Sequence, residues 1–149
     1  MNNMASLKKF LKSKDYLKIP LVLTETNHFE LVASINGVTG KFILDTGASN
    51  TCVGMDKIEF FKMLSEATDI KAAGAGATEM ETLISNKNKI EIGDWKKKKQ
   101  KVVLFDLTHV NQALVSHNAL PVDGIIGADL LKKGKAVIDY HKKCLYLKK

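Results

Sequence analysis

Apolar and polar residues alternate in short runs along most of the chain, a pattern that predicts strands rather than long helices. Phe29 to Ile35 and Val38 to Leu44 are two such runs, and Asn36-Gly37 between them is a strong signal for a hairpin turn. The pattern predicts a mostly β fold. Further strands are expected over Ile19–Thr24, interrupted at its start by Pro20, and over Thr51–Val53, Thr68–Ala72, Met80–Ile84, Lys89–Ile92, Val102–Leu107, Asp123–Gly127, Ala136–Tyr140 and Leu145–Leu147.

Only short segments carry apolar residues at helical spacing. Residues 5–15 place Leu7, Phe10 and Leu11 on one face with lysines between them, which predicts an amphipathic helix. We therefore expect an N-terminal helical extension over residues 1–18 and one main domain over residues 19–149. The other expected helices are one capped by Asp56 with Ile58, Phe61 and Leu64 on its apolar face, a single turn within His109–Leu120, and Ala128–Lys133, ended by Gly134.

Composition fits a folded domain with its own core. The chain has 149 residues, of which 45% are hydrophobic and 26% charged, so disorder is not expected. No apolar run approaches the roughly 20 residues that a membrane-spanning helix needs. The segment Met1–Lys9 has no apolar core long enough for a secretory signal, so we expect a cytoplasmic protein. A secreted protein shortened at its start would look the same.

The chain is basic, with a formal net charge of +7, but every basic residue is Lys. The absence of Arg argues against nucleic acid as a partner, because bidentate contacts to phosphate and guanine favour Arg. Lys96–Lys99 is the densest basic run. We interpret it as a solvated hairpin tip between two strands, and contact with a polyanion is the alternative.

Cysteine and histidine give no sign of a metal or redox centre. Cys52 and Cys144 lie far apart in the sequence and form no C-x-x-C pattern, and Cys52 is expected to be a small buried hydrophobic residue. We therefore expect no metal and no cofactor. The four histidines also lack metal-ligand spacing: His28, His109, His117 and His141.

One stretch has the features of a chemical site. Phe42-Ile43-Leu44 delivers Asp45 into the small-residue turn Thr46-Gly47-Ala48-Ser49. A similar apolar strand, Gly124-Ile125-Ile126, enters a second glycine turn at Gly127 but carries no carboxylate at the matching point. Two such buried strands side by side would form a rigid floor for a single acid.

These segments and their order resemble the retropepsin-like aspartic proteases, particularly the single-domain bacterial and retroviral-type members. The D-T-G-A-S motif at Asp45 follows an apolar strand, a small-residue loop at Gly74-Ala75-Gly76 comes later, and I-I-G-A-D-L-L lies near the C-terminus. The resemblance covers about residues 20–148. It implies a closed acid-protease barrel with short helices, to which the N-terminal helix is an addition.

The resemblance also implies a role for each residue of the motif. Because the chain has one D-T-G motif, an aspartic endopeptidase would need two copies, each giving one Asp45 to a shared catalytic pair that hydrolyses a peptide or protein substrate. Thr46 would bond across the dimer axis, and Gly47 would let backbone approach the acid. The residues expected to contact substrate are Ala48 and the flap residues Gly74, Ala75 and Gly76. Ala48 stands where pepsin-like enzymes have Ser, which favours a less acidic working pH.

The chain departs from the retroviral pattern at one point. Retroviral enzymes have an Arg after the second glycine turn, paired with an Asp just past D-T-G, whereas this chain has Ala128-Asp129 and Asn50. That ion pair cannot form, which keeps one alternative open: a non-catalytic peptide-binding or dimerisation module on the same fold. A polyanion-binding protein that uses the Lys-rich run is the other alternative. For the remaining acids, local capping or bonding to backbone is expected: Asp106, Asp123, Asp129 and Asp139.

Overall fold

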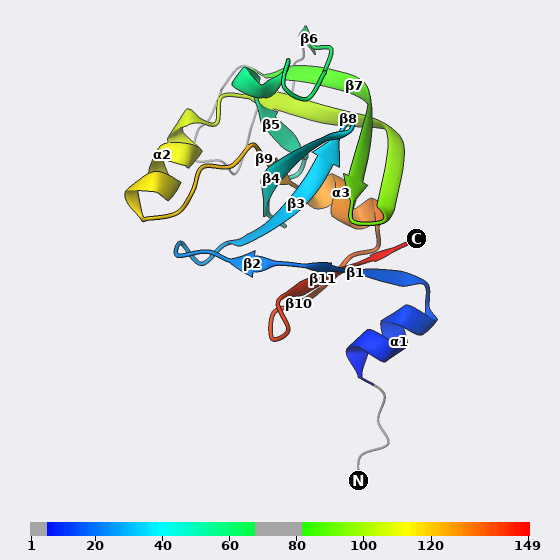
Figure 1. Ribbon diagram of the computed structural model, residues 1–149. Coiled ribbons are helices and arrows are strands. Elements are labelled where there is room, and N and C mark those ends of the chain that lie inside the picture. Colours follow the sequence, from blue (N-terminus) through cyan, green and yellow to red (C-terminus); the bar gives the residue numbers. More distant parts are fainter. Residues whose placement is uncertain (1–5, 68–81) are drawn as a thin grey trace.

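The computed structural model describes residues 6–67 and 82–149. The polypeptide forms a large sheet of order β2-β3-β4-β9-β5-β8-β7-β6, which β3 and β7 close into a barrel by pairing with each other, and a small sheet of order β1-β11-β10 (Figure 1). The mostly β prediction is confirmed. The strands are β1 (Tyr16–Pro20), β2 (Val22–Leu23), β3 (Phe29–Ile35), β4 (Val38–Leu44), β5 (Cys52–Gly54), β6 (Glu66–Ala67), β7 (Leu83–Ile92), β8 (Trp95–Phe105), β9 (Gly124–Ile126), β10 (Val137–Asp139) and β11 (Cys144–Lys148).

The barrel core follows the alternation read from the sequence. Along β3, Leu31, Ala33 and Ile35 are buried while Val32 is 60% exposed. Successive side chains of a strand point to opposite faces, so one face of the β3–β4 hairpin fills the barrel. The largest fully buried side chains of this core include Phe42, Phe61, Ile90 and Leu104.

The β3–β4 turn has the predicted conformation. Asn36 and Gly37 both have positive φ, 52° and 84°, as a two-residue hairpin turn requires. The Asn36 side chain also leaves the turn: its amide nitrogen donates to the backbone oxygen of Phe61 at 2.9 Å, and its oxygen accepts from the backbone N–H of Lys89 at 3.0 Å. The turn thereby fixes the hairpin to β7.

The interpretation of Lys96–Lys99 as a hairpin tip is wrong. The turn lies earlier, at Gly93-Asp94, and the four lysines belong to β8. Gly93 has a φ of +57°, which suits a tight turn, and Ile92 pairs with Trp95 directly across it. The strand tolerates these lysines because each long side chain carries its ammonium group out to water.

Two helical expectations also needed correction. The segment after Asp56 forms only a short 3-10 helix, η1 (Met55–Lys57), and Leu64 is 85% exposed rather than on a buried face. The single turn expected after His109 is a longer helix, α2 (Thr108–Ser116). Helix α3 (Ala128–Lys133), with Gly134 as its C-cap, agrees with the prediction.

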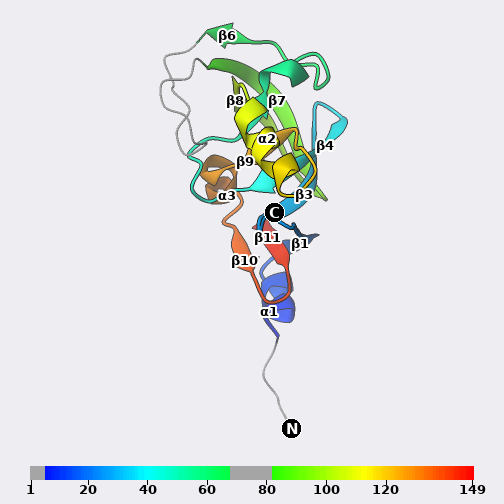
Figure 2. The same ribbon diagram turned by 90° about the vertical axis from the view of Figure 1, so that its left-hand side faces the viewer.

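The N-terminal helix and the small sheet lie together at one end of the molecule, with β6 at the other end (Figure 1 and Figure 2). Helix α1 (Leu7–Ser13) buries Leu11 against Cys144 and Tyr146 of the small sheet. The Trp95 indole N–H donates to the backbone oxygen of Lys148 at 3.0 Å, which connects this sheet to the barrel. Within the described residues, no helix combines the length and apolarity needed to cross a membrane.

Candidate active site

Strand β9 lies between β4 and β5 and positions the D-T-G loop. It runs parallel to β4 and antiparallel to β5, so the loop joining β4 to β5 must pass over the end of β9. Asp45 is the first residue after β4, and its backbone N–H donates to the oxygen of Ile126 at 3.0 Å. The two glycine turns expected from the sequence are therefore neighbours in space.

The Asp45 carboxylate is held by its own loop. Its Oδ1 atom accepts the backbone N–H of Gly47 at 2.8 Å, and its backbone oxygen accepts the N–H of Ala48 at 3.2 Å. Asp45 is half-buried, whereas Thr46 and Gly47 are exposed. A Cβ atom added at Gly47 would lie 3.2 Å from Oδ1, so the glycine leaves room for the carboxylate. The arrangement presents one oriented acid beside an open loop.

Backbone contacts join the D-T-G loop to the second glycine turn. The N–H of Ala128 donates to the oxygen of Ala48 at 2.7 Å, and the N–H of Gly127 donates to the Thr51 hydroxyl at 3.0 Å. A Cβ atom at Gly127 would lie 2.7 Å from the Ala48 oxygen, closer than real Cβ contacts occur. Glycine is therefore required at 127 by the close approach of two backbones rather than by its φ.

Asp129 completes this connection, a role that the sequence analysis missed. Its Oδ1 atom accepts from the backbone N–H of Thr51 at 2.8 Å and from the Thr51 hydroxyl at 2.7 Å. Asp129 is the second residue after Gly127, the region where the retroviral pattern has its Arg. A hydrogen-bonded carboxylate thus connects the two loops.

Cys52 follows the D-T-G loop and its thiol is buried and unreactive. The side chain is 5% exposed, and burial above all raises the pKa of its thiol to about 12, with the carboxylates of Asp129 and Asp45 adding to the effect. The thiol stays protonated near neutral pH and is not an activated nucleophile. Cys52 and Cys144 are both free and buried, as expected for Cys52.

The other predicted site residues have different surroundings. Ala48 is 7% exposed and packs in a second core cluster, so its contact with substrate stays a prediction. Thr46 lines a hollow of about 320 Å³ together with Leu131, Ala136 and Ile138. The flap residues Gly74, Ala75 and Gly76 lie outside the described residues, as does the strand expected over Thr68–Ala72.

Asp106 and Asp139 bond to local backbone, as predicted, whereas Asp123 bonds to the backbone of a residue 82 positions away. Asp123 Oδ2 accepts the N–H of Lys41 at 2.9 Å, and Asp139 accepts the N–H of Lys142 at 3.0 Å. Asp106 accepts both the N–H and the hydroxyl of Thr108, and these bonds lower the pKa of its carboxyl. Over residues 6–67 and 82–149, no group of three or more His, Cys, Asp or Glu side chains is placed to hold a metal ion.

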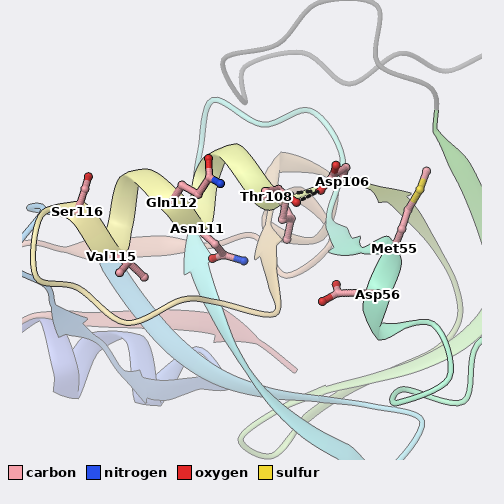
Figure 3. A pocket seen from close by; sticks show the side chains of 9 residues that line it. Met55, Asp56, Asp106, Thr108, Asn111, Gln112, Val115 and Ser116 are labelled. Atoms are coloured by element: carbon pink, nitrogen blue, oxygen red, sulfur yellow. Dashed lines mark hydrogen bonds between the residues drawn. The ribbon is translucent and has the colours of Figure 1, made fainter.

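A larger hollow of about 710 Å³ lies beside helix α2. Figure 3 shows Asp106 and Thr108 bonded to each other at the start of the helix, with Asp56 approaching from η1. Asn111, also on its lining, bonds both backbone groups of Val122: its Nδ2 donates to the oxygen at 3.1 Å and its Oδ1 accepts the N–H at 2.8 Å. Asp106, Thr108 and Asn111 thus bond within the fold, and we assign the hollow no chemistry.

Comparisons with known proteins agree with this fold. A family model described as aspartyl protease matches residues 31–130. A retropepsin-like aspartic protease from Rickettsia conorii is 22% identical, with a TM-score of 0.57, covering 89% of this chain and 90% of that one. The EIAV protease complexed with the inhibitor HBY-793 is 20% identical, with a TM-score of 0.55, covering 74% and 90%.

A third similar structure is the retroviral protease-like domain of Ddi1 from Leishmania major, at 19% identity and a TM-score of 0.55, covering 79% of this chain and 86% of that one. No curated protein matches the sequence significantly. At these identities the structures show the fold, and the family match covers most of the chain. The chain therefore belongs to the aspartyl protease family and has the retropepsin-like fold.

Proposed function

We propose that this protein is a homodimeric aspartic endopeptidase in which each subunit contributes one Asp45. The observation that carries the proposal is the oriented Asp45 carboxylate in an exposed loop, bonded to Gly47 and fixed over the end of β9. The motif occurs once in the chain, so a pair of acids needs a second copy.

The chemistry follows from placing two carboxyl groups about 3 Å apart. Both cannot ionise cheaply, so they share one proton. The ionised member takes a proton from a water molecule, which attacks the peptide carbonyl carbon. The protonated member donates to the carbonyl oxygen and later helps to protonate the leaving nitrogen. The two pKa values with which these carboxyl groups titrate belong to the pair rather than to either residue.

The surface next to Asp45 supports association of two copies. Thr46 is exposed, and the hollow that it lines has apolar side chains from α3, β10 and the segment between them, with two lysines beside them, Lys132 and Lys135. An apolar surface beside an exposed hydroxyl suits a subunit contact in which the hydroxyl finds a polar partner. In the proposed dimer, the twofold axis passes between the two copies of this loop.

A mixing experiment tests the shared pair directly. Wild-type protein is titrated with excess Asp45→Asn protein while cleavage of a peptide library is measured by mass spectrometry. Mixed dimers hold only one acid that can ionise, so activity should fall as the variant is added, and the variant alone should be inactive. Asp94→Asn, the same change in the exposed β7–β8 turn, is the matched control and should leave activity unchanged. Activity of Asp45→Asn alone at the wild-type rate would refute the proposal.

The second candidate is a non-catalytic peptide-binding or dimerisation module on the same fold. The absence of an Arg after Gly127, where the chain has Ala128-Asp129, is the observation that favours it. Sedimentation separates the protease from a peptide-binding module: a strict monomer at high micromolar concentration favours the peptide-binding module, because a single carboxylate cannot form the pair. Nucleic acid binding is not expected for either candidate, and strong salt dependence of such binding would contradict that expectation.

A further inference from the structure

The pairing of β3 has a gap that no other strand of residues 6–67 and 82–149 fills. β2 pairs with β3 only at Phe29 and Glu30, and β7 pairs with it only at Ser34 and Ile35. Residues 31–33 belong to neither register. A hollow of about 420 Å³ opens at this gap. Its lining consists of Lys18, Ile19, Pro20, Val22, Glu30, Leu31, Val32, Lys41 and Gly93.

The backbone of Val32 faces this gap. Two backbone hydrogen bonds mark this edge of β3. The backbone oxygen of His28 accepts the N–H of Thr24 at 2.9 Å, and the N–H of Asn36 donates to the backbone oxygen of Lys89 at 2.8 Å. Backbone groups of an antiparallel strand alternate between its two edges, so even-numbered residues between 28 and 36 face the same way. The N–H and C=O of Val32 are therefore available to an extended chain laid into the gap, and its side chain is 60% exposed.

Glu30 places a carboxylate in the same hollow. The residue is 7% exposed, and its Oε2 atom has no hydrogen-bond partner within the described part of the chain. Burial raises the pKa of its carboxyl, an effect that the charges of Lys41 and His28 partly oppose. A buried carboxylate oxygen without a partner is costly, so a ligand that supplies a cation would gain a strong interaction here.

The nearby lysines do not fill this role. Lys18 and Lys41 line the hollow, yet the ion pairs of the described residues, Lys57–Asp123, Lys89–Glu91 and Lys96–Glu91, do not include Glu30. Glu30 is therefore the acceptor that the fold leaves open. The rest of the lining is mainly apolar, including Ile19, Pro20 and Val22.

We propose that this hollow binds the amino-terminal end of an extended peptide. The α-ammonium group donates to the Glu30 carboxylate, the first side chain packs against Ile19, Pro20 and Val22, and the following peptide group pairs with the backbone of Val32. A cation, an apolar side chain and a strand-like backbone are together what the start of a peptide presents. The proposal does not depend on cleavage at Asp45.

Calorimetry with the tripeptide amide Leu-Val-Ala-NH₂ tests the proposal on the full chain, with mass spectrometry confirming that the peptide stays intact. The comparison ligand is the N-acetylated tripeptide, which has the same side chains but carries an acetyl group in place of the charge. Hydrogen bonds to charged groups contribute about 1.5–3 kcal/mol, so acetylation should weaken binding by about tenfold or more. Glu30→Gln should weaken binding of the free peptide similarly, whereas Glu25→Gln, an exposed acid in the preceding turn, should not.

Amide exchange gives a second measurement, because binding along the strand should slow hydrogen exchange at the Val32 N–H. The same affinity is expected for the Asp45→Asn protein, which separates this site from the proposed active site. Equal binding of the free and acetylated peptides, binding unaffected by Glu30→Gln, or no binding of the free peptide would each overturn the proposal.

Discussion

Asp129 Oδ1 accepts two hydrogen bonds from Thr51, a residue 78 positions earlier in the chain and fully buried. The Thr51 hydroxyl in turn accepts the N–H of Gly127. The loop that carries Asp45 is thus connected to the second glycine turn by a continuous series of hydrogen bonds. The rigidity of the candidate site depends on residues outside the D-T-G motif.

Removing the Asp129 acceptor should destabilise the fold. Asp129→Ala leaves the buried N–H and hydroxyl of Thr51 without their partner, at a cost of about 1–3 kcal/mol for each unsatisfied group. Asp129→Asn keeps an oxygen in the same position and should lose much less. Urea unfolding of the two variants measures the difference, and equal stabilities would show that the bonds to Thr51 contribute little.

Substitution by Ala should have different effects at Gly127 and at Gly47. A Cβ atom at residue 127 would lie 2.7 Å from a backbone oxygen, so Gly127→Ala should force the two loops apart and cost about 1–3 kcal/mol. Gly47→Ala meets only the Asp45 carboxylate at 3.2 Å. It should stay folded but cleave peptides more slowly. Thermal unfolding and peptide cleavage, measured on both variants, test this separation.

Glu30 predicts a dependence of stability on pH. The raised pKa means that the folded chain holds this proton more tightly than the unfolded chain, whose value is near 4.5. The associated stability is fully present below that value and is lost as the pH rises through the folded pKa. Glu30→Gln cannot ionise, so at about pH 7 its unfolding temperature should exceed that of wild type by about 2–4 °C for each kcal/mol regained. The difference should shrink at about pH 4, and a difference independent of pH would contradict the explanation.

Ala48 predicts a working pH that is less acidic than that of pepsin-like enzymes. A hydroxyl at this position would stabilise the neighbouring carboxylate by hydrogen bonding and keep it ionised in more acidic solution. Peptide cleavage should therefore persist above about pH 5, and Ala48→Ser should move the pH–rate profile to lower pH. A wild-type profile that collapses above about pH 5 would count against this role for Ala48.

Local patterns in the sequence predicted the strands and helices that bury one apolar face and expose the other. β3, β4 and α3 begin and end where the alternation, the Asn36-Gly37 turn and Gly134 indicate. In these segments the apolar face and the turn residues favour the same conformation. The position of Asp45 at the end of a buried strand followed from the same reasoning, while its catalytic role stays a prediction.

Features that depend on distant partners could not be read from spacing. The lysines of β8 look like a solvated turn because the strand exposes their ends to water, and only the pairing of Ile92 with Trp95 fixes the turn at Gly93. The bonds from Asp129 to Thr51 likewise arise from tertiary structure. A local pattern can identify an acid that follows a glycine turn, but it cannot indicate which buried groups that acid will satisfy.

The last strand of the chain, β11, is paired along both edges by β1 and β10 of the same chain. A second copy cannot insert a strand beside it, so the proposed subunits would join through loops, side chains and the outer strands of the sheet. Separating the two subunits would break no backbone pairing of β11. Folded monomers would therefore exist in equilibrium with the dimer. At high dilution, the rate of peptide cleavage would then rise with the square of the protein concentration, which makes abundance itself a means of control.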